Sequence, residues 1–408
     1  MIASETSASL VGDRAPASGG NRAGGRFMAL EGYRGLAALL IVVFHLYQFM
    51  RFGNPARYPY KGTGWNLGLQ QLDGFVDLFF VLSAFLLTLP YARSALRGGR
   101  PLAGREFLYR RSVRIVPLYV VAILLVWSAR NTSLPGDWRD LLGHLTFFQV
   151  YDRRTIFYTI GPAWSLAVEV QFYLLLAILG GGLTWICRRL NTVAARRAVL
   201  FGSITTIAML GLGSRLLAAF VLHRSASDWP FWFGLPAKLD VFAVGMLLAV
   251  TVAARADATP LSRNVISSLR LVGLGLLVWG TLTRASDPLP ELYFHDWCAL
   301  GFGLVLAANI LGQRKRSRDL MTARPLAWAG LVSYSLYIWH EPVMLWLAGR
   351  GWLPTPGTPH AFPLGLLVFV PASLLVAYAS YRVIEYPASR LRRSRDQHGH
   401  QRDYYDGT

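Results

Sequence analysis

Long runs of apolar residues dominate the chain, and short polar segments separate them. A helix needs about 20 mostly apolar residues to cross a membrane, and runs of that length without a two-residue alternation predict transmembrane helices. Ten spans are predicted, near residues 29–50, 72–92, 113–130, 162–186, 198–222, 236–254, 268–283, 297–312, 326–348 and 362–384. The fold class is therefore expected to be all-α, a polytopic membrane bundle of about ten helices.

The segments outside these runs complete the predicted organisation. Residues 1–28 are rich in Ser, Ala, Gly and Arg without an apolar core, so they are expected to form a disordered cytoplasmic tail rather than a signal peptide. A membrane domain is expected over residues 29–388, followed by a basic cytoplasmic tail at 389–408. The longest connection, 131–161, contains the semi-apolar stretch "LLGHLTFFQV", which predicts an interfacial helix.

Composition and charge agree with a membrane protein. Hydrophobic residues make up 53% of the chain and charged residues 15%, and the net charge is +19. Most Lys and Arg residues lie in alternate connecting segments, which by the positive-inside rule places both termini in the cytoplasm. No nucleic-acid-binding motif accompanies the charge. The two cysteines, Cys187 and Cys298, have no metal-ligand or disulfide spacing.

Ionisable residues inside the spans are the candidate functional groups, because charges are costly there. Arg34 and His45 bracket the first span in "RGLAALLIVVFH". Eleven residues of helix cover about 16 Å and end about 20° past three full turns, so both side chains share one face. Arg34 is expected near the cytoplasmic end and His45 in the outer half.

The other ionisable residues separate into two predicted levels. The outer half is expected to hold His45, Asp77, Glu169, Asp240 and His340, with Lys238 as a possible neutralising partner of Asp240. The cytoplasmic face is expected to hold Arg34, Arg110, Arg111, Arg114 and Glu385. Each residue alone also fits a packing or dipole role. The remaining histidines, His144, His223, His295 and His360, are given no role.

This layout suits a donor with phosphates at one end and a reactive group on a long arm. Guanidinium groups suit phosphates, and histidine with carboxylates suits general-base activation of a hydroxyl. Acyl-CoA is such a donor. A proton-coupled transporter or flippase of a glycoconjugate is the main alternative, although neither repeats nor matched broken helices are evident. A non-catalytic membrane scaffold is a third alternative, but it does not explain why the ionisable residues separate into two predicted levels.

Six motifs in a fixed order make the sequence similar to the integral-membrane acyltransferase-3 family of bacterial O-acyltransferases. They are "RGLAALLIVVFH", "FVDLFFVLSAFLL", "RRSVRIVPLY", "WSLAVEVQFYLL", "SYSLYIWHEP" and "IEYPASR", and they extend over roughly residues 29 to 390. The clearest departure is Ala84, where the family commonly has glycine. This departure concerns how closely the second span packs.

The resemblance implies a ten-span enzyme of the bacterial cytoplasmic membrane that moves acetyl or other acyl groups onto hydroxyls. Family acceptors include surface polysaccharides, peptidoglycan, Nod factors and macrolide antibiotics, so the acceptor here is expected to be a carbohydrate or glycosylated metabolite. No tightly bound cofactor or metal is implied; acyl-CoA, most commonly acetyl-CoA, is the expected donor substrate. Many members carry a C-terminal esterase-like domain, which is not expected within these 408 residues.

The expected site combines the motifs with the two charge levels. The donor phosphates are expected to bind the inner arginines Arg34, Arg110, Arg111 and Arg114. His45 is expected to act as general base or transient acyl carrier, oriented or charge-balanced by Glu169 and Asp77, with His340 as a secondary candidate.

Overall fold

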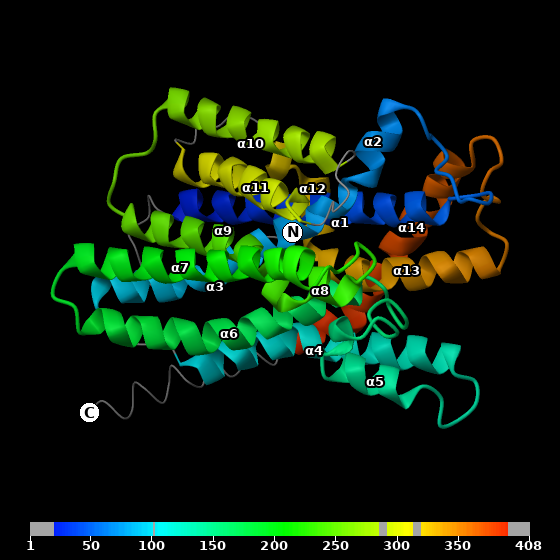
Figure 1. The fold of residues 1–408 in the computed structure, drawn as a ribbon, viewed down its shortest axis with the longest axis horizontal. Helices are drawn as coiled ribbons and strands as arrows, with labels where there is room; N and C mark the ends of the chain where they lie inside the picture. The colour runs from blue at the N-terminus through cyan, green and yellow to red at the C-terminus, as the bar shows by residue number, and fades with distance from the viewer. Residues whose placement is uncertain (1–19, 101–102, 285–291, 313–319, 391–408) are drawn as a thin grey trace.

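The computed structural model describes residues 20–100, 103–284, 292–312 and 320–390 of the chain. The described part is a bundle of helices that run mostly along the long axis of the molecule (Figure 1). Among these residues, nine helices are long and apolar enough to cross a membrane. The prediction of an all-α polytopic bundle is confirmed.

The helices follow the predicted runs closely. The long ones are α1 (Gly20–Phe49), α3 (Phe75–Arg97), α4 (Gly104–Arg130), α6 (Ala163–Arg188), α7 (Val193–Leu216), α9 (Leu235–Ala254), α10 (Arg263–Arg284), α11 (Phe294–Leu311), α13 (Ser333–Gly349) and α14 (Ala361–Ser380). The short ones are α2 (Gly64–Gln70), α5 (Trp138–Leu145), α8 (Trp229–Phe233) and α12 (Arg324–Leu331). The 3₁₀ turns are η2 (Leu72–Gly74), η3 (Gln149–Tyr151) and η5 (Leu320–Thr322), and the π-helical turns are η4 (Leu217–Val221) and η6 (Tyr381–Glu385).

Two boundaries differ from the prediction. α1 begins at Gly20, inside the segment predicted as a disordered tail; the preceding residues and those after 390 lie outside the described part. The ninth predicted span, 326–348, is divided at Val332 into α12 and α13. The division coincides with a tight crossing of α12 over α1, where Gly330 lies against the backbone of Glu31.

The connections alternate between the two ends of the bundle. Figure 1 shows the α6–α7 and α9–α10 connections at one end (left), and α2, α5 and the α13–α14 connection at the other (right). Segments that charge assigns to the same side of the membrane therefore share an end. The cytoplasmic orientation of that end is a prediction from the positive-inside rule.

In the core, α3 packs against both α6 and α9. Phe242 of α9 stacks on Phe172 of α6, with ring centroids 4.0 Å apart, and its ring lies 4.8 Å from that of Phe80 on α3. A side chain on Gly245 would collide with the Val81 carbonyl oxygen and meet the Ala84 methyl group. The room expected from a glycine at position 84 is thus supplied by Gly245 on the facing helix.

Gly35 on α1 makes an equally close approach. A Cβ there would collide with the Leu326 carbonyl oxygen of α12 and lie 2.6 Å from the Gly330 nitrogen. Gly35→Ala is expected to lower the free energy of unfolding by about 1–3 kcal/mol, because both obstacles are backbone atoms that cannot rotate away. Thermal unfolding in detergent measures this change.

Gly181→Ala on α6 is the matched control, because nothing lies within 4 Å of a Cβ at that position. Alanine favours a helix over glycine by about 1 kcal/mol, so this variant should be at least as stable as the wild type. Equal melting temperatures for the two alanine variants would contradict the close contact between α1 and α12.

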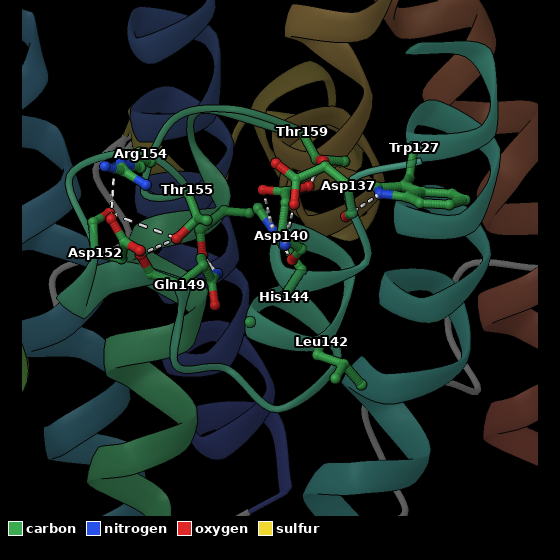
Figure 2. A network of polar contacts seen from close by, with 12 residues as sticks. Trp127, Asp137, Asp140, Leu142, His144, Gln149, Asp152, Arg154, Thr155 and Thr159 are labelled. Atoms are coloured by element: carbon green, nitrogen blue, oxygen red, sulfur yellow. Dashed lines mark hydrogen bonds and ion pairs between the residues drawn. The ribbon is translucent and has the colours of Figure 1, made fainter. Parts of the chain in front are cut away.

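The short helix α5 has its polar side buried and its apolar side exposed. Asp140 and His144 are 0% exposed, whereas Leu142 is 50% and Trp138 51% exposed. Figure 2 shows Leu142 pointing away from the polar groups. An interfacial helix was predicted in residues 141–150; α5 at Trp138–Leu145 covers the first half of that stretch, and a 3₁₀ turn begins at Gln149. An outward apolar face is typical of a helix at a membrane surface, which stays a prediction here.

Candidate active site

Two histidines from helices far apart in sequence meet in the bundle. The His45 ring of α1 lies 4.7 Å, centroid to centroid, from the His340 ring of α13, at 63° between the planes. His340 is buried and His45 partly buried. The structure thus brings together two of the four residues predicted to be catalytic.

Backbone carbonyls fix the tautomer of both rings. His45 Nδ1 lies 2.9 Å from the Ile41 carbonyl oxygen, and His340 Nδ1 lies 3.1 Å from that of Leu336. A carbonyl oxygen only accepts, so each Nδ1 carries the hydrogen and each Nε2 carries a lone pair. His340 Nε2 is buried and has no hydrogen-bond partner among the described residues. Each of the two Nε2 lone pairs is a proton acceptor.

Glu169 lies in a separate group of polar contacts. Its carboxylate accepts hydrogen bonds from Ser83 of α3 and, at 2.5 Å, from the Tyr173 hydroxyl one turn along α6. The structure therefore does not show Glu169 orienting His45 by a direct bond, because the Nδ1 partner of His45 is a main-chain carbonyl. Glu169 instead faces the arginines.

Three of the four predicted anion-binding arginines gather around Glu169. Arg34 of α1 lies within electrostatic range of Arg114 and Glu169, and Arg111 of α4 lies within range of all three. Glu385 of η6 is also close to Arg34 and Arg114. Arg111 and Arg114 share this side because residues three apart lie on one helix face. The group holds three cationic side chains, and Glu31, which lies 3.7 Å from Arg34, joins Glu169 and Glu385 as its anionic side chains.

Arg110 has different surroundings from the other three. Its guanidinium donates to the Glu106 carboxylate at 2.6 Å, and its side chain is 46% exposed. Glu106 is four residues earlier on α4, so this is a local surface pair. The structure does not place Arg110 among the charges around Glu169.

Asp77 and Asp240, predicted at the depth of His45, have other partners. Asp77 Oδ2 lies 2.8 Å from His295 Nδ1 of α11. Arg215 of α7 bridges Asp240, at 2.5 Å, and Asp296, at 2.6 Å. These two carboxylates belong to a charged group between α3, α7, α9 and α11.

Lys238 was predicted as a possible neutralising partner of Asp240. Its ammonium nitrogen instead lies 5.1 Å from the Phe233 ring centroid and 5.9 Å from that of Trp164. Arg215 is the residue that balances Asp240. Such cation–aromatic contacts suit a buried lysine near apolar surfaces.

Comparison with known proteins assigns the chain to a family. Residues 28–382 match a family model described as an acyltransferase domain. The chain belongs to the acyltransferase-3 family. The resemblance carried by the six sequence motifs is confirmed.

Two relatives of this acyltransferase-family chain have the same sequence identity to it. The O-acetyltransferase OatA of Staphylococcus aureus is 24% identical over 379 residues, covering 88% of this chain and 56% of that protein. The peptidoglycan O-acetyltransferase OatA of Listeria monocytogenes is 24% identical over 381 residues, covering 88% and 55%. The chain spans about half the length of the curated relatives it matches. No solved structure matches it.

Two buried histidine–aspartate pairs in this acyltransferase-family chain were not predicted from the sequence. His295 pairs with Asp77, and His144 pairs with Asp140. The second had a visible signal, since Asp140 and His144 are four residues apart and share a helix face. The first depends on the packing of α11 against α3, which no sequence pattern indicated.

Proposed function

We propose that the chain is a membrane O-acyltransferase that transfers an acyl group, most commonly acetyl, from acyl-CoA to a hydroxyl of a carbohydrate. The observation that carries the proposal is the placement of Arg34 and His45 on one helix of a family member, each with a suitable group of neighbours. Eleven residues of helix separate an anion site from a base by about 16 Å.

The donor site is assigned to Arg34, Arg111 and Arg114. Guanidinium groups form charge-assisted, often bidentate hydrogen bonds with phosphates. Glu169 and Glu385 hold the arginines together when no donor is bound, as their proximity supports. Phosphate oxygens then compete with these carboxylates for the guanidinium donors.

The reaction is assigned to His45. Its Nε2 takes the proton of the acceptor hydroxyl while the hydroxyl oxygen attacks the thioester carbonyl carbon. The carbon–sulfur bond breaks, and the thiolate leaves with the electron pair. The imidazolium then returns its proton to the sulfur, giving the ester and free CoA thiol. His340, with its Nε2 lone pair beside the same ring, shares the proton while it is held.

The acceptor is assigned to the carbohydrate class. The Listeria relative is named as acting on peptidoglycan, and the outer end of the bundle is where the predicted topology places His45. Soluble peptidoglycan fragments are therefore the first acceptors to test.

The test uses the full chain in lipid nanodiscs with acetyl-CoA and soluble peptidoglycan fragments. We expect thiol release that increases on adding the fragments, and products that gain one acetyl group by mass spectrometry. Movement of the glycan across the bilayer without thiol release would overturn the proposal in favour of a transporter.

A further inference from the structure

A buried polar network holds the segment between α4 and α6 in place. The Thr159 hydroxyl donates to Asp140 Oδ2, and both side chains are buried. His144 Nδ1 lies 3.0 Å from the Asp140 carbonyl oxygen and 3.1 Å from its Oδ1. Figure 2 shows how these contacts link Asp140 and His144 of α5 to Thr159, which lies in the loop that leads to α6.

The network extends into both neighbouring long helices. The Tyr119 hydroxyl of α4 donates to the His144 carbonyl oxygen at 3.0 Å. The Gln149 amide donates to that same hydroxyl, at 3.2 Å, and to the Ala163 carbonyl at the start of α6, at 3.3 Å. The segment is therefore tied to α4 and α6 through groups that are themselves buried.

Directly after Thr159, the chain contacts the helix that carries His340. The Gly161 N–H donates to Glu341 Oε2 at 2.5 Å. The Tyr337 hydroxyl donates to the Pro162 carbonyl at 3.1 Å. Glu341 follows His340 in sequence, and the Tyr337 ring lies 5.8 Å from the His340 ring. The turn at 159–162 thus contacts α13 at Tyr337, before His340 in sequence, and at Glu341, directly after it.

We propose that Asp140, His144 and Thr159 are positioning residues of the acyl-transfer centre. They hold the 159–162 turn against Glu341 and Tyr337, and the turn sets where His340 faces His45. The inference rests on the proposed function, and it adds to that function a set of residues that do not touch the reacting atoms.

The chemistry of the network favours positioning over stability alone. Polar groups removed from water gain little net stability even when paired, and apolar side chains of the same volume would serve as well. The hydrogen bonds of Thr159 to Asp140 Oδ2 and of His144 Nδ1 to the Asp140 carbonyl instead fix one geometry, because each hydrogen bond has a required direction. Asp140 Oδ1 and His144 Nε2 are buried without a hydrogen-bond partner among the described residues. A displacement of about 1 Å at a reacting group can cost about 100-fold in rate.

The experiment compares Thr159→Val with Thr146→Val, using acetyl-CoA and soluble peptidoglycan fragments. Thr146 is in the same segment, but it is exposed and bonds only within α5. We expect Thr159→Val to lower kcat of the folded protein about 10-fold with the donor KM unchanged, Thr146→Val to have no effect, and Thr159→Ser to restore kcat. Wild-type kcat in folded Thr159→Val, or equal losses in both valine variants, would overturn the proposal.

A second measurement is independent of activity. Hydrogen–deuterium exchange of the peptide containing Gly161 should accelerate in Asp140→Asn and Thr159→Val. It should not accelerate in Asp152→Asn, where an exposed carboxylate only accepts from the Arg154 N–H. Unchanged exchange in the first two variants would overturn the positioning role even if transfer occurs. Absence of thiol release by the wild type would overturn the proposed function and leave this measurement to decide the positioning.

Discussion

Replacing His45 by asparagine is expected to lower kcat about 100- to 10,000-fold, the usual contribution of a general base. Asparagine has hydrogen-bonding capacity, but no lone-pair nitrogen that can take a proton at neutral pH. His340 is not expected to substitute, because its side chain and its Nε2 atom are both buried. Acceptor-dependent thiol release measures the loss.

His223→Asn is the matched control for this variant. His223 is exposed and has a positive φ of 48°, a conformation that asparagine adopts readily. We expect full activity from it, and melting temperatures close to the wild type for both variants. Full activity of folded His45→Asn would exclude His45 as the base or acyl carrier.

Replacing Arg34 by alanine is expected to raise the donor KM about 10- to 100-fold. Hydrogen bonds to charged groups contribute about 1.5–3 kcal/mol, which corresponds to that range. The change should be largest for acetyl-CoA and small for a donor analogue that keeps the thioester and pantetheine arm but lacks the nucleotide phosphates. Initial rates at varied donor concentration measure it.

Arg110→Ala is the control that the structure supplies and the sequence did not. All four arginines were predicted to bind the donor, yet Arg110 is paired with Glu106 at the surface of α4. We expect Arg110→Ala to change the donor KM about ten times less than Arg34→Ala changes it. An effect of Arg110→Ala as large as that of Arg34→Ala would contradict the assigned donor site, and so would a change confined to the acceptor KM in Arg34→Ala.

The helices could be predicted from the sequence because hydrophobic run length alone specifies a membrane span. The division at Val332 could not, because it coincides with a contact between α12 and α1, two elements about 300 residues apart in sequence. Helix α5 was predicted from a semi-apolar stretch. The burial of its polar side could not be predicted, because it depends on the packing of Asp140 and His144 against α4.

Residues on one helix were predicted better than partnerships between helices. Arg34 and His45 share a face by periodicity; of the group expected around His45, the structure places His340 beside it and gives the three carboxylates other partners. Depth along a helix, however, says nothing about which neighbour a side chain faces. Asp77 was predicted at the depth of His45, and it bonds to His295 because α11 packs against α3.

The close contact of Ala84 with Gly245 has an evolutionary consequence. The room needed where α3 crosses α9 belongs to the pair of helices, so either helix can supply the small residue. Substitutions at these two positions are therefore expected to covary among relatives. A sequence alignment that considers position 84 alone would indicate that a glycine has been replaced. The space between α3 and α9 is nevertheless present, because Gly245 on α9 provides it.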